Sequence, residues 1–83
     1  MTVYIDKPRK VKFRGKVVST AHLMADTEEE LHNFASQFGL RREWFQNHPT
    51  HPHYDVFEWY GRLNKILQVL TPISSKEMLR KFK

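Results

Sequence analysis

The chain has 83 residues, carries a formal net charge of +5 and contains no cysteine. This length predicts one domain, residues 1–83, with a small core, because a chain of this size buries roughly 60–65% of the surface that its unfolded form exposes. The lack of cysteine excludes disulfides and thiolate metal ligands and fits a reducing compartment. No apolar run approaches the ~20 residues of a membrane-spanning helix, so we expect a cytoplasmic protein with no membrane partner.

Basic residues are concentrated in two segments. The first spans residues 7–16, has no acidic residue and contains Lys7, Arg9, Lys10, Lys12, Arg14 and Lys16. The second lies near the C-terminus and contains Lys76, Arg80, Lys81 and Lys83. This distribution favours an anionic partner: nucleic acid, another phosphate-bearing ligand, or an acidic protein surface. A solvated, solubilising loop is the alternative interpretation of the first segment.

The first part of the chain predicts two short strands. Residues 2–6 alternate apolar and polar side chains and are rich in β-favouring residues, which is typical of a strand. The basic segment 7–16 is expected to form a loop that turns at Gly15. Residues 16–25 predict the second strand, in which His22 lies on the face opposite the better core face.

A helix is predicted next, because Thr27 and Glu30 have the spacing of a capping box and acidic residues fill its first turn. Gly39 suits the left-handed position that ends a helix. Residues 40–46 fit either a helical turn or a short strand. We expect Trp44–Phe45 to close the core, although an exposed aromatic could serve as a stacking surface.

The second half predicts two more helices. Asp55 and Glu58 have the spacing of a cap, followed by an apolar stripe that ends before Pro72. A third capping pattern predicts a last short helix over residues 74–81. The fold class is therefore α+β, with two short strands and about three helices packed on one side.

The candidate site lies where a crossing segment follows the first helix. His51, His53 and Asp55 alternate along an extended segment, so they can point the same way. His22 also needs a partner, and Asp6 ends the neighbouring strand on the matching face. We expect His22 and His53 to lie within a few ångströms of each other, with Asp6 or Asp55 alongside.

These residues support two classes of function. In the first, the protein binds nucleic acid or another phosphate-bearing ligand. Its candidate ligand-binding residues are Arg9, Lys10, Lys12, Arg14, His22, Arg41, Arg42, His53 and Tyr54. In the second, a divalent metal ion assists hydrolysis of a phosphodiester, since imidazole and carboxylate groups bind transition metals. Its candidate metal ligands are Asp6, His22, His53 and Asp55. We favour binding, with no cofactor required, and assign no catalytic residue.

Several short motifs run through nearly the whole chain. They are Val3-Tyr4-Ile5-Asp6, Pro8-Arg9, His22-Leu23, Ala25-Asp26, Glu30-Leu31-His32, Gly39-Leu40-Arg41, Trp44-Phe45, His53-Tyr54-Asp55-Val56 and Ser74-Ser75-Lys76-Glu77. With these motifs the chain resembles a family of short bacterial and phage proteins that is catalogued as a domain of unknown function. The resemblance implies a compact domain in bacterial or host cytoplasm and supplies no activity. It marks Asp6, His22, His53 and Asp55 as shared positions, and it adds a third alternative, a phage protein that binds and blocks a host protein.

Overall fold

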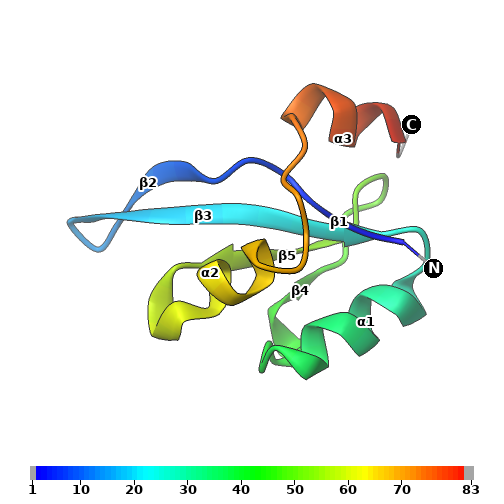
Figure 1. The fold of residues 1–83 in the computed structure, drawn as a ribbon, viewed down its shortest axis with the longest axis horizontal. Helices are drawn as coiled ribbons and strands as arrows, with labels where there is room; N and C mark the ends of the chain where they lie inside the picture. Colours follow the sequence, from blue (N-terminus) through cyan, green and yellow to red (C-terminus); the bar gives the residue numbers. More distant parts are fainter. Residues whose placement is uncertain (1, 82–83) are drawn as a thin grey trace.

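Residues 2–81, which the computed structural model describes, form a five-stranded antiparallel sheet with three α-helices (Figure 1). The strands are β1 (Val3–Ile5), β2 (Arg9–Phe13), β3 (Lys16–Ala25), β4 (Phe45–Gln46) and β5 (His53–Phe57). The helices are α1 (Glu28–Gln37), α2 (Arg62–Leu67) and α3 (Ser75–Lys81), with 3₁₀ turns η1 (Arg42–Trp44) and η2 (Trp59–Gly61). The α+β class is confirmed, whereas the expectation of only two strands is wrong.

The long strand β3 organises the sheet. β1 and β2 pair with its two halves along one edge, and β5 pairs with the other edge. β4 pairs with the outer edge of β5, which gives the order β1-β3-β5-β4. Residues directly across from each other share a face of a sheet. The pairs Arg9↔Thr20 and His22↔Asp55 therefore put residues from three strands on one face.

The core lies on the opposite face of the sheet. Helices α1 and α2 cover it, as Figure 1 shows below the strands. Its buried residues are Ile5, Ala21, Leu23, Ala25, Leu31, Ala35, Leu40, Tyr54, Val56, Leu63 and Ile66. Helix α3 lies on the other side of the sheet, so the expectation of three helices on one side is wrong. The physical reason is that the sheet also carries apolar surface there: Met24 of β3 and Met78 of α3 are both buried outside the core cluster.

The basic segment expected as a loop is instead strand β2 with a two-residue turn into β3. Arg14 and Gly15 both have positive φ, 50° and 81°, as in the tight turns that match the twist of a hairpin. The turn at Gly15 is thus confirmed. β2 takes an edge position, and an edge strand tolerates many lysines because charge there opposes pairing with other chains.

The helix predicted to begin at Asp55 does not begin until Arg62, and Asp55 lies within β5. Glu58 does not cap it, because its Oε1 accepts a hydrogen bond from the backbone N–H of Ser19 at 2.7 Å. The Tyr60–Gly61 pair has φ values of 58° and 69°, which a continuous right-handed helix cannot contain. None of the helices among residues 2–81 has the length and apolar character needed to cross a bilayer.

The predicted capping of the other two helices is confirmed. The hydroxyl oxygen of Thr27 accepts a hydrogen bond from the N–H of Glu30 at 3.2 Å, and that of Ser74 accepts one from the N–H of Glu77 at 3.2 Å. Each cap satisfies a backbone donor that the helix leaves without an internal partner. Local sequence alone therefore defines where α1 and α3 begin.

Replacement of Thr27 by alanine is expected to lower the free energy of unfolding by about 1 kcal/mol, because the N–H of Glu30 loses its acceptor. Urea denaturation followed by circular dichroism measures the change. Thr27→Ser is the matched control, since it keeps the hydroxyl and should lose much less stability. Equal losses in the two variants would assign the effect to the methyl group rather than to the cap.

Candidate functional site

A polar cluster lies on the face of the sheet opposite the α1–α2 core. His22 of β3 pairs with Asp55 of β5, and His53 lies two residues before Asp55 on the same face. The centroids of the two imidazole rings are 4.9 Å apart, with an interplanar angle of 80°. The predicted approach of His22 and His53 is confirmed, although 31 positions separate them.

Asp6 fixes the orientation of the His22 ring. Its side chain is buried, and the residue is 1% exposed. Oδ1 of Asp6 accepts a hydrogen bond from the backbone N–H of His22 at 2.7 Å, and Oδ2 lies 2.9 Å from Nδ1 of the ring. Asp6 itself is held between β3 and a parallel bridge to Ile73. Because a carboxylate only accepts, Nδ1 of His22 carries a proton, and in its neutral form the ring then presents its lone pair at Nε2.

His53 is oriented in the same way by a backbone carbonyl. Its Nδ1 donates to the carbonyl oxygen of His51 at 2.7 Å, so the neutral form of this ring also has its lone pair at Nε2. The Nε2 atoms of His22 and His53 each lie 3.5 Å from Oδ1 of Asp55. The three residues offer one ligand atom each within 4.8 Å of one another. Two lone pairs and a carboxylate thus converge on one point, which favours a cation there.

Arg9 supplies a cation to this cluster in the structure. Its Nη2 lies 2.8 Å from Nε2 of His22, and its Nη1 lies 3.8 Å from Oδ2 of Asp6. Nη1 also lies 3.4 Å from Nδ1 of His22. A guanidinium has no acceptor, so Nε2 of His22 accepts in the shorter contact, which agrees with the tautomer set by Asp6. The Arg9 side chain is 48% exposed. It can therefore leave His22 without disturbing the core.

The other predicted basic residues lie away from this cluster. Lys10 and Lys12 alternate with Arg9 along β2 and are exposed on the opposite face of the sheet. The guanidinium of Arg14 lies over the ring of Phe13 at the hairpin turn. Arg41 forms an exposed ion pair with Glu43, with Nε and Oε1 2.9 Å apart. These residues can attract an anion to the surface. Arg9 is the candidate basic residue for which the structure shows a contact with the His/Asp cluster.

Tyr54 lies on the core face and not beside His22 and His53. It is buried, and its hydroxyl group hydrogen-bonds with Nδ1 of His32 at 2.7 Å. Burial raises the pKa of Tyr54 above its usual value, although the charge of Arg42 opposes the shift. We leave Tyr54 out of the site, since its hydroxyl is occupied within the core.

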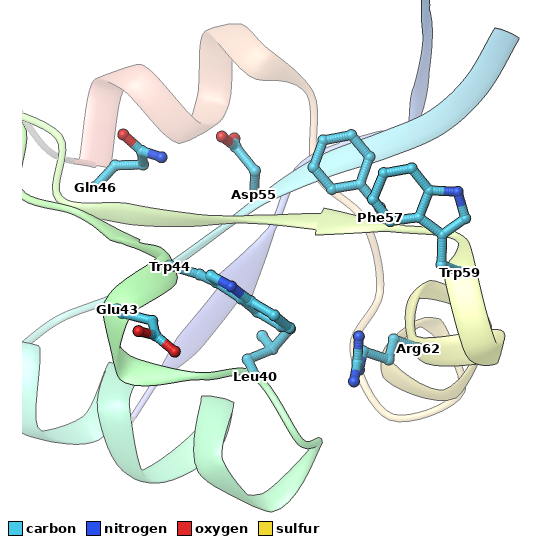
Figure 2. Close-up of a pocket in the computed structure, with 8 residues that line it drawn as sticks. All are labelled: Leu40, Glu43, Trp44, Gln46, Asp55, Phe57, Trp59 and Arg62. Carbon is cyan, nitrogen blue, oxygen red and sulfur yellow. The ribbon is translucent and has the colours of Figure 1, made fainter. Parts of the chain in front are cut away.

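An aromatic cavity borders the cluster and was not predicted. It has a volume of about 370 Å³ and lies between Trp44 on one side and Phe57 and Trp59 on the other (Figure 2). Asp55 lines both the cavity and the His/Asp cluster. Trp44 is 38% exposed and lies outside the core cluster, so the expectation that it closes the core is wrong. Phe45 does pack against the core, as expected. His53, Asp55 and Phe57 alternate along β5 and therefore share one face of the sheet. The sequence indicates this wall of the cavity only if residues 53–57 are read as a strand.

The fold and the cluster define a small α+β protein with an Asp/His/Arg site on the open face of an antiparallel sheet. Over residues 3–83 the chain matches the family described as "Protein of unknown function (DUF4031)", and it belongs to that family. This match confirms the resemblance drawn from the sequence motifs. No curated protein and no solved structure matches the chain.

Proposed function

We propose that the protein binds a divalent metal ion through His22, His53 and Asp55 and uses it to hydrolyse phosphate esters. The observation that carries the proposal is the convergence of the Nε2 atoms of His22 and His53 on one carboxylate oxygen of Asp55, each at 3.5 Å. Two imidazoles and one carboxylate suit zinc or a similar transition metal. Three protein ligands also leave a position open for water or substrate, as catalytic sites require.

The groups behind the ligands support the proposal. Metal-binding histidines usually donate their other N–H to a carboxylate or a backbone carbonyl, which fixes the ring. The carboxylate of Asp6 does this for His22, and the carbonyl group of His51 does it for His53. A surface histidine that has no functional role needs neither a carboxylate nor a carbonyl group to orient its ring. We therefore assign Asp6 and His51 as positioning groups and the Nε2 atoms as ligands.

The metal ion, Arg9 and the basic residues of the hairpin would have different roles in the proposed reaction. A divalent ion would make water nucleophilic at neutral pH by lowering its pKa. In hydrolysis the water oxygen forms a bond to phosphorus, one ester P–O bond breaks, and the departing alkoxide takes a proton. Arg9 would turn from His22 to the phosphate oxygens, which guanidinium groups bind well. Lys10, Lys12 and Arg14 of the β2–β3 hairpin would attract the anionic substrate.

A metal-free function is the second candidate, because Arg9 already supplies a positive charge 2.8 Å from Nε2 of His22. In that case Arg9, His22 and His53 would bind a phosphate group directly by hydrogen bonds. The protein would then be a binding module for nucleic acid or another phosphate-bearing ligand. The two candidates differ in what stabilises the fold: a metal ion alone in the first, and a phosphate-bearing ligand without metal in the second.

Thermal unfolding with zinc, manganese or magnesium tests the metal site. A ligand that binds only the folded state adds about 2.7 kcal/mol when its free concentration is 100 times its dissociation constant. For a domain of this size that corresponds to a rise in Tm of about 10–20 °C. We expect this rise with zinc or manganese in the natural protein and its loss in His22→Ala. Hydrolysis of bis(p-nitrophenyl) phosphate should depend on the same ion.

His48→Ala is the matched control. His48 lies in the loop before β5, where its Nδ1 accepts hydrogen bonds from the backbone N–H groups of Thr50 and His51, and it is not part of the cluster. This variant should keep the metal-induced rise in Tm. A rise that survives in His22→Ala, or no rise with any of the three ions in the natural protein, contradicts the proposal. Stabilisation by phosphate in the presence of EDTA would then support the metal-free candidate.

A further inference from the structure

The aromatic cavity continues the proposed site along β5. Side chains at alternate positions of this strand share a face, so Phe57 follows His53 and Asp55 on the same side of the sheet. β4 pairs with β5 at Tyr54 and His53 and leaves the stretch from Asp55 to Phe57 beside the cavity. Asp55 therefore connects the proposed metal site to the cavity. A ligand bound at one could reach the other.

The walls of the cavity are suited to a flat aromatic ring. Trp44 forms one side, and the rings of Phe57 and Trp59 form the other, stacked at 4.5 Å between centroids (Figure 2). The guanidinium of Arg62 lies 5.2 Å from the centre of the Trp44 ring. Planar bases stack on aromatic side chains and on arginine planes. Leu40 adds apolar surface to the lining of the cavity.

Polar side chains also line the cavity, which distinguishes it from a purely apolar groove. These side chains belong to Gln46, Glu43 and Asp55. An amide group donates and accepts hydrogen bonds, and a carboxylate accepts them, so these residues can pair with the edge of a heterocyclic base. A few placed polar groups around an apolar cavity are typical of sites for small organic ligands.

We infer that this cavity binds the unpaired base of a nucleotide whose phosphate group reaches the His22–His53–Asp55 cluster. The inference rests on the proposed function, since it names the substrate as a nucleotide or a single-stranded nucleic acid. A base in a duplex is stacked and paired and cannot enter a cavity at the edge of this sheet. The charged hairpin at the end of β2 and β3 would hold the neighbouring phosphates of a longer strand.

Tryptophan fluorescence tests the inference, because both tryptophans of the chain, Trp44 and Trp59, line the cavity. The probe is AMP in the presence of EDTA, so that base binding is measured without metal. Ribose 5-phosphate is the matched probe that lacks the base. We expect AMP to quench the fluorescence and ribose 5-phosphate to bind at least about tenfold more weakly, given the strength of base–aromatic stacking.

Two variants of Trp44 show whether its ring is the stacking partner. In Trp44→Leu, followed through Trp59, AMP should bind about tenfold more weakly, whereas Trp44→Phe should retain most of the affinity. Both variants must first give the far-ultraviolet circular dichroism of the parent. Equal binding of AMP and ribose 5-phosphate by the natural protein overturns the inference. Unchanged AMP affinity in Trp44→Leu overturns it as well.

Binding of oligonucleotides shows whether the base comes from a free nucleotide or from a nucleic acid. Comparison of AMP binding with metal binding distinguishes failure of this inference from failure of the proposed function. Tighter binding of a short single-stranded oligonucleotide than of AMP supports a nucleic-acid substrate, and the reverse supports a free nucleotide. Equal binding of the corresponding duplex contradicts the requirement for an unpaired base. If AMP binds and zinc or manganese does not stabilise the protein, the metal proposal fails and the base site stands. If the metal binds and AMP does not, the base site fails alone.

Discussion

Asp6→Asn is expected to reduce metal affinity by about 10–100-fold, the usual effect of losing the group behind a ligating histidine. Asparagine keeps the size of the side chain and can still accept from the backbone N–H of His22. Its NH₂ group, however, would face Nδ1 of the ring, where the carboxylate now accepts at 2.9 Å. The ring would then carry its proton on Nε2 and lose the lone pair that faces Asp55. Titration calorimetry with zinc measures the loss.

The control for this substitution is Asp26→Asn. It removes the same charge from an exposed aspartate, which follows β3 and accepts a hydrogen bond from the hydroxyl group of Tyr4 at 3.0 Å. Zinc affinity should be unchanged in this variant. Nitrogen-15 NMR of His22 provides a second measurement, because it distinguishes the two tautomers directly. A ring that stays protonated at Nδ1 in Asp6→Asn, or equal zinc affinities in the two variants, would refute the positioning role of Asp6.

The elements that depend on local chemistry could be predicted from the sequence. Thr27 and Glu30 define the start of α1, and Gly39 its end, because each acts through neighbours a few residues away. The histidine pair could also be predicted. A histidine in the middle of β3, off its core face, and another in an extended segment both require partners, and the fold brings them to 4.9 Å.

Strand β5 could not be predicted in this way, because its sequence satisfies two patterns at once. Asp55 and Glu58 have the spacing of a helix cap, and the apolar positions from Val56 onward fit helical periodicity as well as a strand. The choice depends on pairing with β3, which lies more than thirty positions away and is invisible to a local window. The aromatic cavity was missed for the same reason, since Phe57 faces it only if the segment is a strand.

Strand β2 was missed because few of its residues are apolar. Arg9, Lys10 and Lys12 suggest a solvated loop, and only pairing with β3 makes the segment a strand. The consequence for the site is large. Because β2 is a strand, Arg9 lies on the same face of the sheet as His22, and Lys10 lies on the opposite face. We therefore expect different roles for these two adjacent basic residues. This difference can be tested directly.

Arg9→Ala is expected to change metal binding and turnover in opposite directions. Zinc affinity should rise, because the guanidinium no longer occupies Nε2 of His22 at 2.8 Å. The kcat/KM for the phosphodiester should fall roughly 10–100-fold, since a hydrogen bond from a charged donor contributes about 1.5–3 kcal/mol. Calorimetry gives the first quantity, and steady-state hydrolysis at saturating zinc gives the second.

Lys10→Ala is the matched control, because it removes the same charge one position away on the same strand. Lys10 is exposed and opposes Ser19, on the face away from His22. Its loss should lower kcat/KM only slightly, and the loss should vanish as salt screens the long-range attraction. The effect of Arg9→Ala should persist in salt, because it comes from direct contact with the phosphate. If the two variants lose kcat/KM equally and with the same dependence on salt, Arg9 acts only through its charge, like the other basic residues of the hairpin. Arg9 would then not be part of the site.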